Sequence, residues 1–176
     1  MNWDIVPVKL PALLAVCGTG MQLKILWVGK TRNPLLSALC EDYLERVRRM
    51  VRCKVVEVRD LSRGSGARGA QLLTAERAEI EKHLGETSRI VSLDESGTEF
   101  SSRDFARWFQ KEQTLGTREL NFVIGGADGI SAEFLQRAHL RLSLGKMTWT
   151  HEMARVLLLE QIYRAFSILH NSPYHK

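Results

Sequence analysis

Runs of large apolar residues alternate along the chain with amphipathic stretches, and this pattern predicts five strands and five helices. Strands are expected where apolar and β-branched residues cluster between turn residues, at 22–28, 53–59, 88–94, 119–125 and 139–144. A helix is expected at 34–48, where apolar residues share one face. Further helices are expected at 71–84, which is polar, from 101 or 102 to 113, from 131, and at 151–169. Asn33 before Pro34, and Thr150 before the last helix, are suited to begin helices. Strands that alternate with helices predict an α/β domain, with a mostly parallel sheet and helices on both faces.

The loops that follow three of the strands are the expected ligand sites. In a parallel sheet, ligands bind at the carboxyl ends of the strands, which here means the loops after Leu93, Ile124 and Leu144. The second of these loops contains three glycines between Gly125 and Gly129. Glycine lets a ligand approach the backbone closely. A plain strand-to-helix turn, which needs only one glycine, is the alternative interpretation.

Length and composition favour one domain, preceded by a short extension. The 176 residues suit one compact domain, and no apolar run reaches the ~20 residues that span a bilayer. Residues 1–20 contain Pro7 and Pro11 and are expected to be a loosely ordered extension, with 21–176 as the single domain. They lack the basic start of a signal peptide. Met21 opens the first expected strand and is an alternative natural start.

The charge distribution and the cysteines both bear on the expected partners. The net charge is +5, and between residues 46 and 68 eight basic residues stand against Glu57 and Asp60. Arginines suit phosphate oxygens, so this stretch favours contact with an RNA backbone, with a merely solvated face as the alternative. Cys17, Cys40 and Cys53 form no paired motif, which indicates a reducing, cytoplasmic location and no metal site.

A second glycine motif, at 64–69, formally matches the G-x-G-x-x-G fingerprint of dinucleotide-binding proteins. That fingerprint normally forms a tight turn directly after the first strand. Here residues 60–63 intervene after the second strand, and the next helix is polar. The sequence therefore favours a basic loop, and an NAD-dependent oxidoreductase is the lesser alternative.

The last helix, at 151–169, is apolar over most of its girth, which indicates deep burial in the core or against a second copy of the chain. Its Arg155 and Arg164 are nine residues apart and so point to opposite sides of the helix. A homodimer could bring one from each chain to a single site. The simpler alternative is that Arg164 pairs with Glu160, four residues before it.

Six segments together resemble one known family. They are Met21–Lys30 (MQLKILWVGK), Phe122–Gly126 (FVIGG), Leu142–Trp149 (LSLGKMTW), His151–Arg155 (HEMAR), Glu160–Phe166 (EQIYRAF) and Pro173–Lys176 (PYHK). In this order they resemble the RlmH family, the SPOUT-class methyltransferases of bacterial large-subunit ribosomal RNA. Any one segment is a weak signal, but six in order along 21–176 are specific. The extension 1–20 lies outside the resemblance.

The resemblance implies a fold and an activity. It implies a C-terminal trefoil knot, a homodimer, and methyl transfer from S-adenosylmethionine to N3 of a pseudouridine in 23S rRNA of assembled ribosomes. No metal and no membrane are implied. The implied cofactor contacts are Leu93, Gly125, Gly126, Leu144, Gly145, Lys146, Met147, Thr148 and Trp149.

The methylated nitrogen must lose its proton, and five residues are candidates to assist. They are His151, Arg155, Arg164, Tyr174 and His175, as groups that receive the proton or favour the deprotonated base. Each also has a structural interpretation, such as His151 beginning a helix or Tyr174 packing on a partner. A non-catalytic ribosome- or RNA-binding factor is the alternative function.

Overall fold

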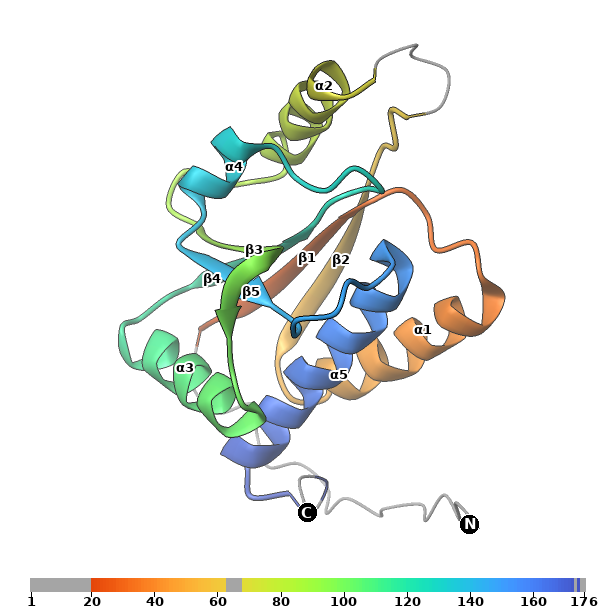
Figure 1. The fold of residues 1–176 in the computed structure, drawn as a ribbon. Coiled ribbons are helices and arrows are strands. Elements are labelled where there is room, and N and C mark those ends of the chain that lie inside the picture. Colours follow the sequence, from red (N-terminus) through yellow and green to blue (C-terminus); the bar gives the residue numbers. More distant parts are fainter. Residues whose placement is uncertain (1–19, 63–67, 173, 175–176) are drawn as a thin grey trace.

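The computed structural model describes residues 20–62, 68–172 and 174, and its centre is a parallel sheet (Figure 1). The strands are β1 (Gln22–Val28), β2 (Arg52–Val58), β3 (Arg89–Glu99), β4 (Glu119–Ile124) and β5 (Leu140–Ser143). They lie in the order β2-β1-β4-β3-β5, and every pairing is parallel. The predicted parallel α/β sheet is therefore confirmed.

Helices cover both faces of this sheet, as predicted (Figure 1). They are α1 (Pro34–Arg48), α2 (Ala70–Glu81), α3 (Ser102–Thr114), α4 (Ala132–Arg137) and α5 (His151–Leu169). Helices α1, α3 and α5 pack on one face, and α2 and α4 on the other. Alternate residues of β1 serve the two cores, because side chains of a strand point to opposite faces: Ile25 enters the first core and Leu26 the second.

Side-chain caps fix where the helices begin. Asn33 accepts hydrogen bonds from the backbone of the first turn of α1, which has Pro34 as its first residue. Ser101, Ser131 and Thr150 each accept a backbone N–H in the same way at the starts of α3, α4 and α5. These oxygens satisfy N–H groups that have no partner inside the helix. The helix starts could therefore be predicted to within a residue or two.

Strand β3 is longer than the sequence pattern predicts. The expected strand ended at Asp94, whereas β3 continues to Glu99 and pairs with β5 again at Thr98 and Glu99, after a shift in register. The added segment carries polar residues that are partly or fully exposed. It has no apolar alternation to reveal it, and its hydrogen bonds to β5 supply the order that burial supplies elsewhere.

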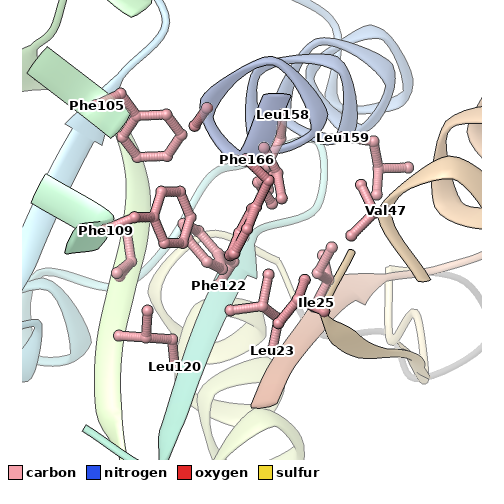
Figure 2. Packing of buried hydrophobic residues seen from close by; sticks show 14 of the residues in the cluster. Leu23, Ile25, Val47, Phe105, Phe109, Leu120, Phe122, Leu158, Leu159 and Phe166 are labelled. Atoms are coloured by element: carbon pink, nitrogen blue, oxygen red, sulfur yellow. The ribbon is translucent and has the colours of Figure 1, made fainter. Parts of the chain in front are cut away.

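The main core is aromatic and is built around α5 (Figure 2). Phe109 of α3 lies 4.8 Å from Phe105, 6.0 Å from Phe122 and 5.0 Å from Phe166, measured between ring centroids. Eight residues of α5 are buried within this single chain. The core-helix interpretation of α5 thus accounts for most of its apolar surface.

Some sequence predictions concern residues that the structure does not describe. The expected extension, apart from Gly20, and residues 64–67 of the glycine-rich loop lie outside the described residues. Within the described part, no helix is long and apolar enough to cross a membrane. No group of three or more His, Cys, Asp or Glu residues there is arranged to hold a metal ion.

Replacing Phe109 by alanine is expected to lower the free energy of unfolding by ~3–5 kcal/mol, because the ring fills the centre of the aromatic core. The matched control is Leu115→Ala, at the end of α3, whose side chain is 62% exposed. That change should stay within about 0.5 kcal/mol. Urea denaturation of both variants measures the difference, and equal losses would contradict this description of the core.

Candidate active site

Two cavities lie at the carboxyl edge of the sheet, on either side of the first turns of α5. The α3–α5 cavity, about 380 Å³, is lined by Glu99, Phe100, Ser101, Ser102, Phe105, Leu142, Ser143, Leu144, Gly145, Trp149, Leu157 and Gln161. The β1–β4 cavity, about 240 Å³, is lined by Val28, Gly29, Lys30, Arg32, Asp60, Ser62, Leu72, Glu76, Gly126, Ala127, Asp128, His151 and Glu152. Both open where ligands bind in parallel sheets.

The loop between β5 and α5 forms one wall of the α3–α5 cavity. Its turn is closed by Ser143, whose Oγ accepts a hydrogen bond from Gly145 N (3.2 Å) and donates one to Gly145 O (3.1 Å). Gly145 has φ +118°, a conformation that favours glycine. Thr148 Oγ1 donates to Glu95 of β3 at 3.4 Å. The loop therefore has a fixed turn and a contact to the added segment of β3.

The nine expected cofactor contacts do not all fall on this cavity. Leu144, Gly145 and Trp149 line it, and Gly126 lines the β1–β4 cavity instead. The remaining five, all among the described residues, line neither cavity: Leu93, Gly125, Lys146, Met147 and Thr148. Leu93 lies beside Leu142 of β5. At Gly125 an added Cβ would lie 2.1 Å from the carbonyl oxygen of Gly129, so only glycine fits there.

Arg155 is completely buried, at 0% exposure. Its Nη2 donates to the carbonyl oxygen of Val28 (2.7 Å) and its Nη1 to Thr31 Oγ1 (2.8 Å). The guanidinium carbon lies 5.2 Å from the ring centroid of Trp27. Its Nε has no hydrogen-bond partner in the described part of the chain, and burial lowers the pKa of the group. Arg155 thus ties α5 to the end of β1.

The neighbouring residues of α5 extend this connection to the loop before α1. The carboxylate of Glu152 accepts hydrogen bonds from the backbone N–H groups of Arg32 (2.9 Å) and Asn33 (3.1 Å). These bonds are among the causes that lower the pKa of Glu152, the Arg32 bond first. His151 lines the β1–β4 cavity, and burial, followed by the charge of Arg155, lowers its pKa. Its imidazole is accordingly biased toward the neutral form.

Arg164 lies at the other end of α5, in a separate cluster. It pairs with Glu160 at 2.6 Å, as the simpler of the two interpretations from the sequence expected. Tyr174 OH donates to Glu160 Oε1 (3.3 Å) and lies 3.4 Å from Tyr43 OH. Burial raises the pKa of Tyr174, and the guanidinium carbon of Arg164 is 5.0 Å from its ring centroid.

One copy of the chain does not unite the five expected catalytic residues. His151 and Arg164 are thirteen positions apart, which is ~20 Å along an α-helix. His151 faces the β1–β4 cavity, Arg155 is buried beneath it, and Arg164 lies with Tyr174 at the far end of α5. His175 is outside the described residues.

Sequence reasoning missed Glu76, an acidic residue of α2 that is only 4% exposed and lines the β1–β4 cavity. Burial raises the pKa of its carboxyl, with Asp60 and Asp128 acting in the same direction and a backbone hydrogen bond from Leu61 opposing them. A signal did exist, because Glu76 stands midway between Leu72 and Ile80 at four-residue spacing, on the buried face of the helix.

A family model and the most similar curated relatives both indicate a methyltransferase family. Residues 21–175 match the family model described as "Predicted SPOUT methyltransferase". Ribosomal RNA large subunit methyltransferase H of Geobacter sulfurreducens is 42% identical over 155 residues, or 88% of this chain and 99% of that protein. The protein with the same name from Pelobacter propionicus is 43% identical over the same shares.

A solved structure of a probable methylase family protein from Haemophilus influenzae covers 89% of this chain and 71% of its own, at 13% identity and a TM-score of 0.49. A likeness at that level does not establish a relationship between the two proteins. The family model spans nearly all of the described residues, and the two relatives are more than 40% identical over most of the chain. The chain therefore belongs to the SPOUT methyltransferase family.

Proposed function

We propose that this protein transfers a methyl group from S-adenosylmethionine to N3 of a pseudouridine in large-subunit ribosomal RNA, on assembled ribosomes in the cytoplasm. The observation that carries the proposal is the identity of more than 40% to proteins named ribosomal RNA large subunit methyltransferase H, over 99% of their length. The two cavities at the carboxyl edge of the sheet supply places for a cofactor and for an acceptor.

The α3–α5 cavity fits the adenosyl part of the cofactor. Phe100, Leu144 and Leu157 give it apolar walls, and Trp149, 40% exposed, supplies a large aromatic ring. Serine and glutamine side chains add hydrogen-bonding groups. Gly145, at φ +118°, has no neighbour within 4 Å of an added Cβ, so the backbone there is open to a ligand. When bound, S-adenosylmethionine supplies an activated methyl group on a sulfonium, and the chain has mainly to align the acceptor with it.

A knotted chain path is part of the proposal. The added segment of β3 lies so close to β5 that a Cβ at Gly97 would be 2.7 Å from the backbone carbon of Arg141. The register of the two strands shifts at the same place. We take this irregular, close pairing of β3 with β5, directly before the cofactor loop, as support for the proposed threading of the C-terminal segment.

The RNA contact is proposed along β2 and the end of α1. Arg52 and Lys54 of the edge strand β2 are exposed, as suits contacts to phosphate oxygens. Arg46 and Arg49 of the same predicted basic stretch instead form ion pairs with acidic residues one turn earlier in α1 and so carry less free charge. The stretch is therefore a smaller cationic surface than its composition suggests.

We propose that His151 receives the N3 proton, whereas Arg155 acts through the backbone that it holds. The pKa of His151 is expected below its ordinary value of 6.5, because burial and Arg155 both disfavour the imidazolium. In Arg155→Met the titration midpoint should rise, since one of these two causes is removed. Arg107→Met is the control, because this exposed arginine of α3 lines neither cavity and is not among the charges that shift the pKa of His151. Titration by NMR measures the midpoints, and a wild-type midpoint above 6.5 would refute the assignment.

A second copy of the chain would bring the separated groups together. Leu35 and Leu39, one turn apart on α1, are 74% and 44% exposed and form an apolar strip available to a partner. If His151 of one copy works with Arg164 of the other, His151→Ala and Arg164→Ala should each be inactive alone. Mixed, they should recover about a quarter of wild-type activity, because half of randomly mixed two-fold dimers hold one intact site of two. Mixtures without recovery, or a monomer in sedimentation, would contradict a shared site.

Labelled methyl transfer tests the proposed activity itself. Wild-type protein and labelled S-adenosylmethionine are incubated with ribosomes that lack the modification, in parallel with free 50S subunits and protein-free 23S rRNA. Label is expected at a single pseudouridine of 23S rRNA, and most strongly with assembled ribosomes. Binding of the cofactor without transfer would indicate another acceptor. Neither binding nor transfer would leave a non-catalytic RNA-binding factor as the better account.

A further inference from the structure

The β1–β4 cavity is a second ligand site with a composition of its own. Its volume of about 240 Å³ is several times the ~30 Å³ that one water molecule occupies in the liquid, so the cavity has room for a single-ring base. Val28 and Leu72 give it apolar surface, and Gly126 gives it exposed backbone. His151, the first residue of α5 and the residue after the cap Thr150, is part of its lining.

A buried carboxyl points into this cavity. Glu76 lines it while remaining 96% buried, and its Oε2 would be 3.3 Å from a Cβ at Gly126. The absence of a side chain at Gly126 therefore lets the carboxyl lie close to the β4–α4 loop. Helix α2 has leucine and isoleucine at the equivalent positions one turn away on either side. A carboxyl is costly to bury there. The backbone hydrogen bond from Leu61 uses part of its acceptor capacity, and the two oxygens of a carboxylate leave further lone pairs for a ligand.

The lining of the cavity carries charges of both signs, with Lys30 and Arg32 as its cations and Asp60, Asp128 and Glu152 as acids besides Glu76. Lys30 and Arg32 lie on the loop between β1 and α1, and the Arg32 side chain is 51% exposed and 3.8 Å from Asp60. Cations at the rim suit the phosphates of a nucleotide whose base has entered. Apolar surface, a buried carboxyl and an exposed lysine at the rim together match a nucleotide that presents a ring N–H group.

We propose that the β1–β4 cavity holds the acceptor base and that Glu76 accepts a hydrogen bond from the ring N1–H of pseudouridine. The inference rests on the proposed function. Uridine carries its sugar on N1 and has no hydrogen there, whereas pseudouridine has both N1–H and N3–H. A site that binds such an N–H discriminates strongly against an analogue without it. Glu76 is thus a specificity-determining residue for this base.

The reaction balances without any exchange at Glu76. N3 loses its proton to a base such as His151 and forms a bond to the methyl carbon. The bond from that carbon to sulfur breaks, and its electron pair remains on sulfur. Glu76 meanwhile keeps its hydrogen bond to N1–H, which orients N3 away from the carboxyl. Replacement of Glu76 should therefore change the preference for pseudouridine over uridine more than the rate of methyl transfer.

The test compares two acceptors: ribosomes with pseudouridine at the target position, and ribosomes with uridine there, prepared from cells without the corresponding synthase. The variants are Glu76→Gln and Glu76→Leu, and the matched control is Glu79→Gln, which removes a carboxylate of α2 outside the cavity. For wild type and the control, kcat/KM should favour pseudouridine strongly. In Glu76→Leu this preference should fall roughly 5- to 150-fold, with a smaller fall in Glu76→Gln, which keeps a neutral acceptor.

The ratio of kcat/KM for the two acceptors separates a role of Glu76 in base selection from a general loss of activity. Both acceptors are assayed with one preparation, so any unfolded fraction cancels from the ratio, and affinity for S-adenosylhomocysteine should stay within about twofold of wild type if the cofactor site is separate. An unchanged ratio, an equal loss on both acceptors, or a wild type that does not discriminate would overturn the role of Glu76 while leaving the proposed function intact. A wild type that methylates neither acceptor would overturn the proposed function, and this inference with it.

Discussion

The structure at the carboxyl edge of the sheet depends on the hydrogen bonds of the buried Arg155 guanidinium. This group carries a charge at 0% exposure, and its hydrogen bonds go to two neutral oxygens, of Val28 and Thr31, beside the ring of Trp27. Hydrogen bonds to a charged group contribute about 1.5–3 kcal/mol each, and a buried charge that loses its partners is strongly destabilising. The group therefore holds the end of β1 and the start of α5 in one relative position.

Both cavities take their geometry from that fixed position. Three residues before Arg155 on α5, Glu152 accepts hydrogen bonds from the backbone of Arg32 and Asn33 and so holds the loop that lines the β1–β4 cavity. Directly before α5 lies the loop with Gly145 and Trp149 that lines the α3–α5 cavity. The positions of a cofactor in one cavity and of a base in the other would thus both depend on the first turns of α5 and on the hydrogen bonds of Arg155 and Glu152. Alignment of acceptor and methyl group is what such a reaction needs most.

Much of the fold could be predicted from the sequence, because its signals are local. Apolar periodicity and the caps at Asn33 and Thr150 give the elements and their starts. The added segment of β3 could not be predicted, since its order comes from pairing with β5, far away in sequence, and its residues are polar.

The site was harder to predict than the fold. An arginine in a motif shows that a charge is present but not that it is buried, so the complete burial of Arg155 could not be predicted. Glu76 was passed over because a glutamate in a polar helix is ordinarily solvated, and only the packing of α2 against the sheet buries it. The pairing of Arg164 with Glu160 is local, by contrast, and could be predicted.

A crystal structure of the protein with S-adenosylhomocysteine would test the account most directly. We expect the adenosine of the ligand to contact residues 144–149 and its sulfur to be directed toward the β1–β4 cavity. The β1–β4 cavity itself should contain no part of the adenosine, and Arg155 should still donate its hydrogen bond to the carbonyl oxygen of Val28. We also expect a chain that passes its C-terminal segment through the loop beside the added segment of β3. A nucleoside bound against Glu76, or an unthreaded chain, would contradict the account.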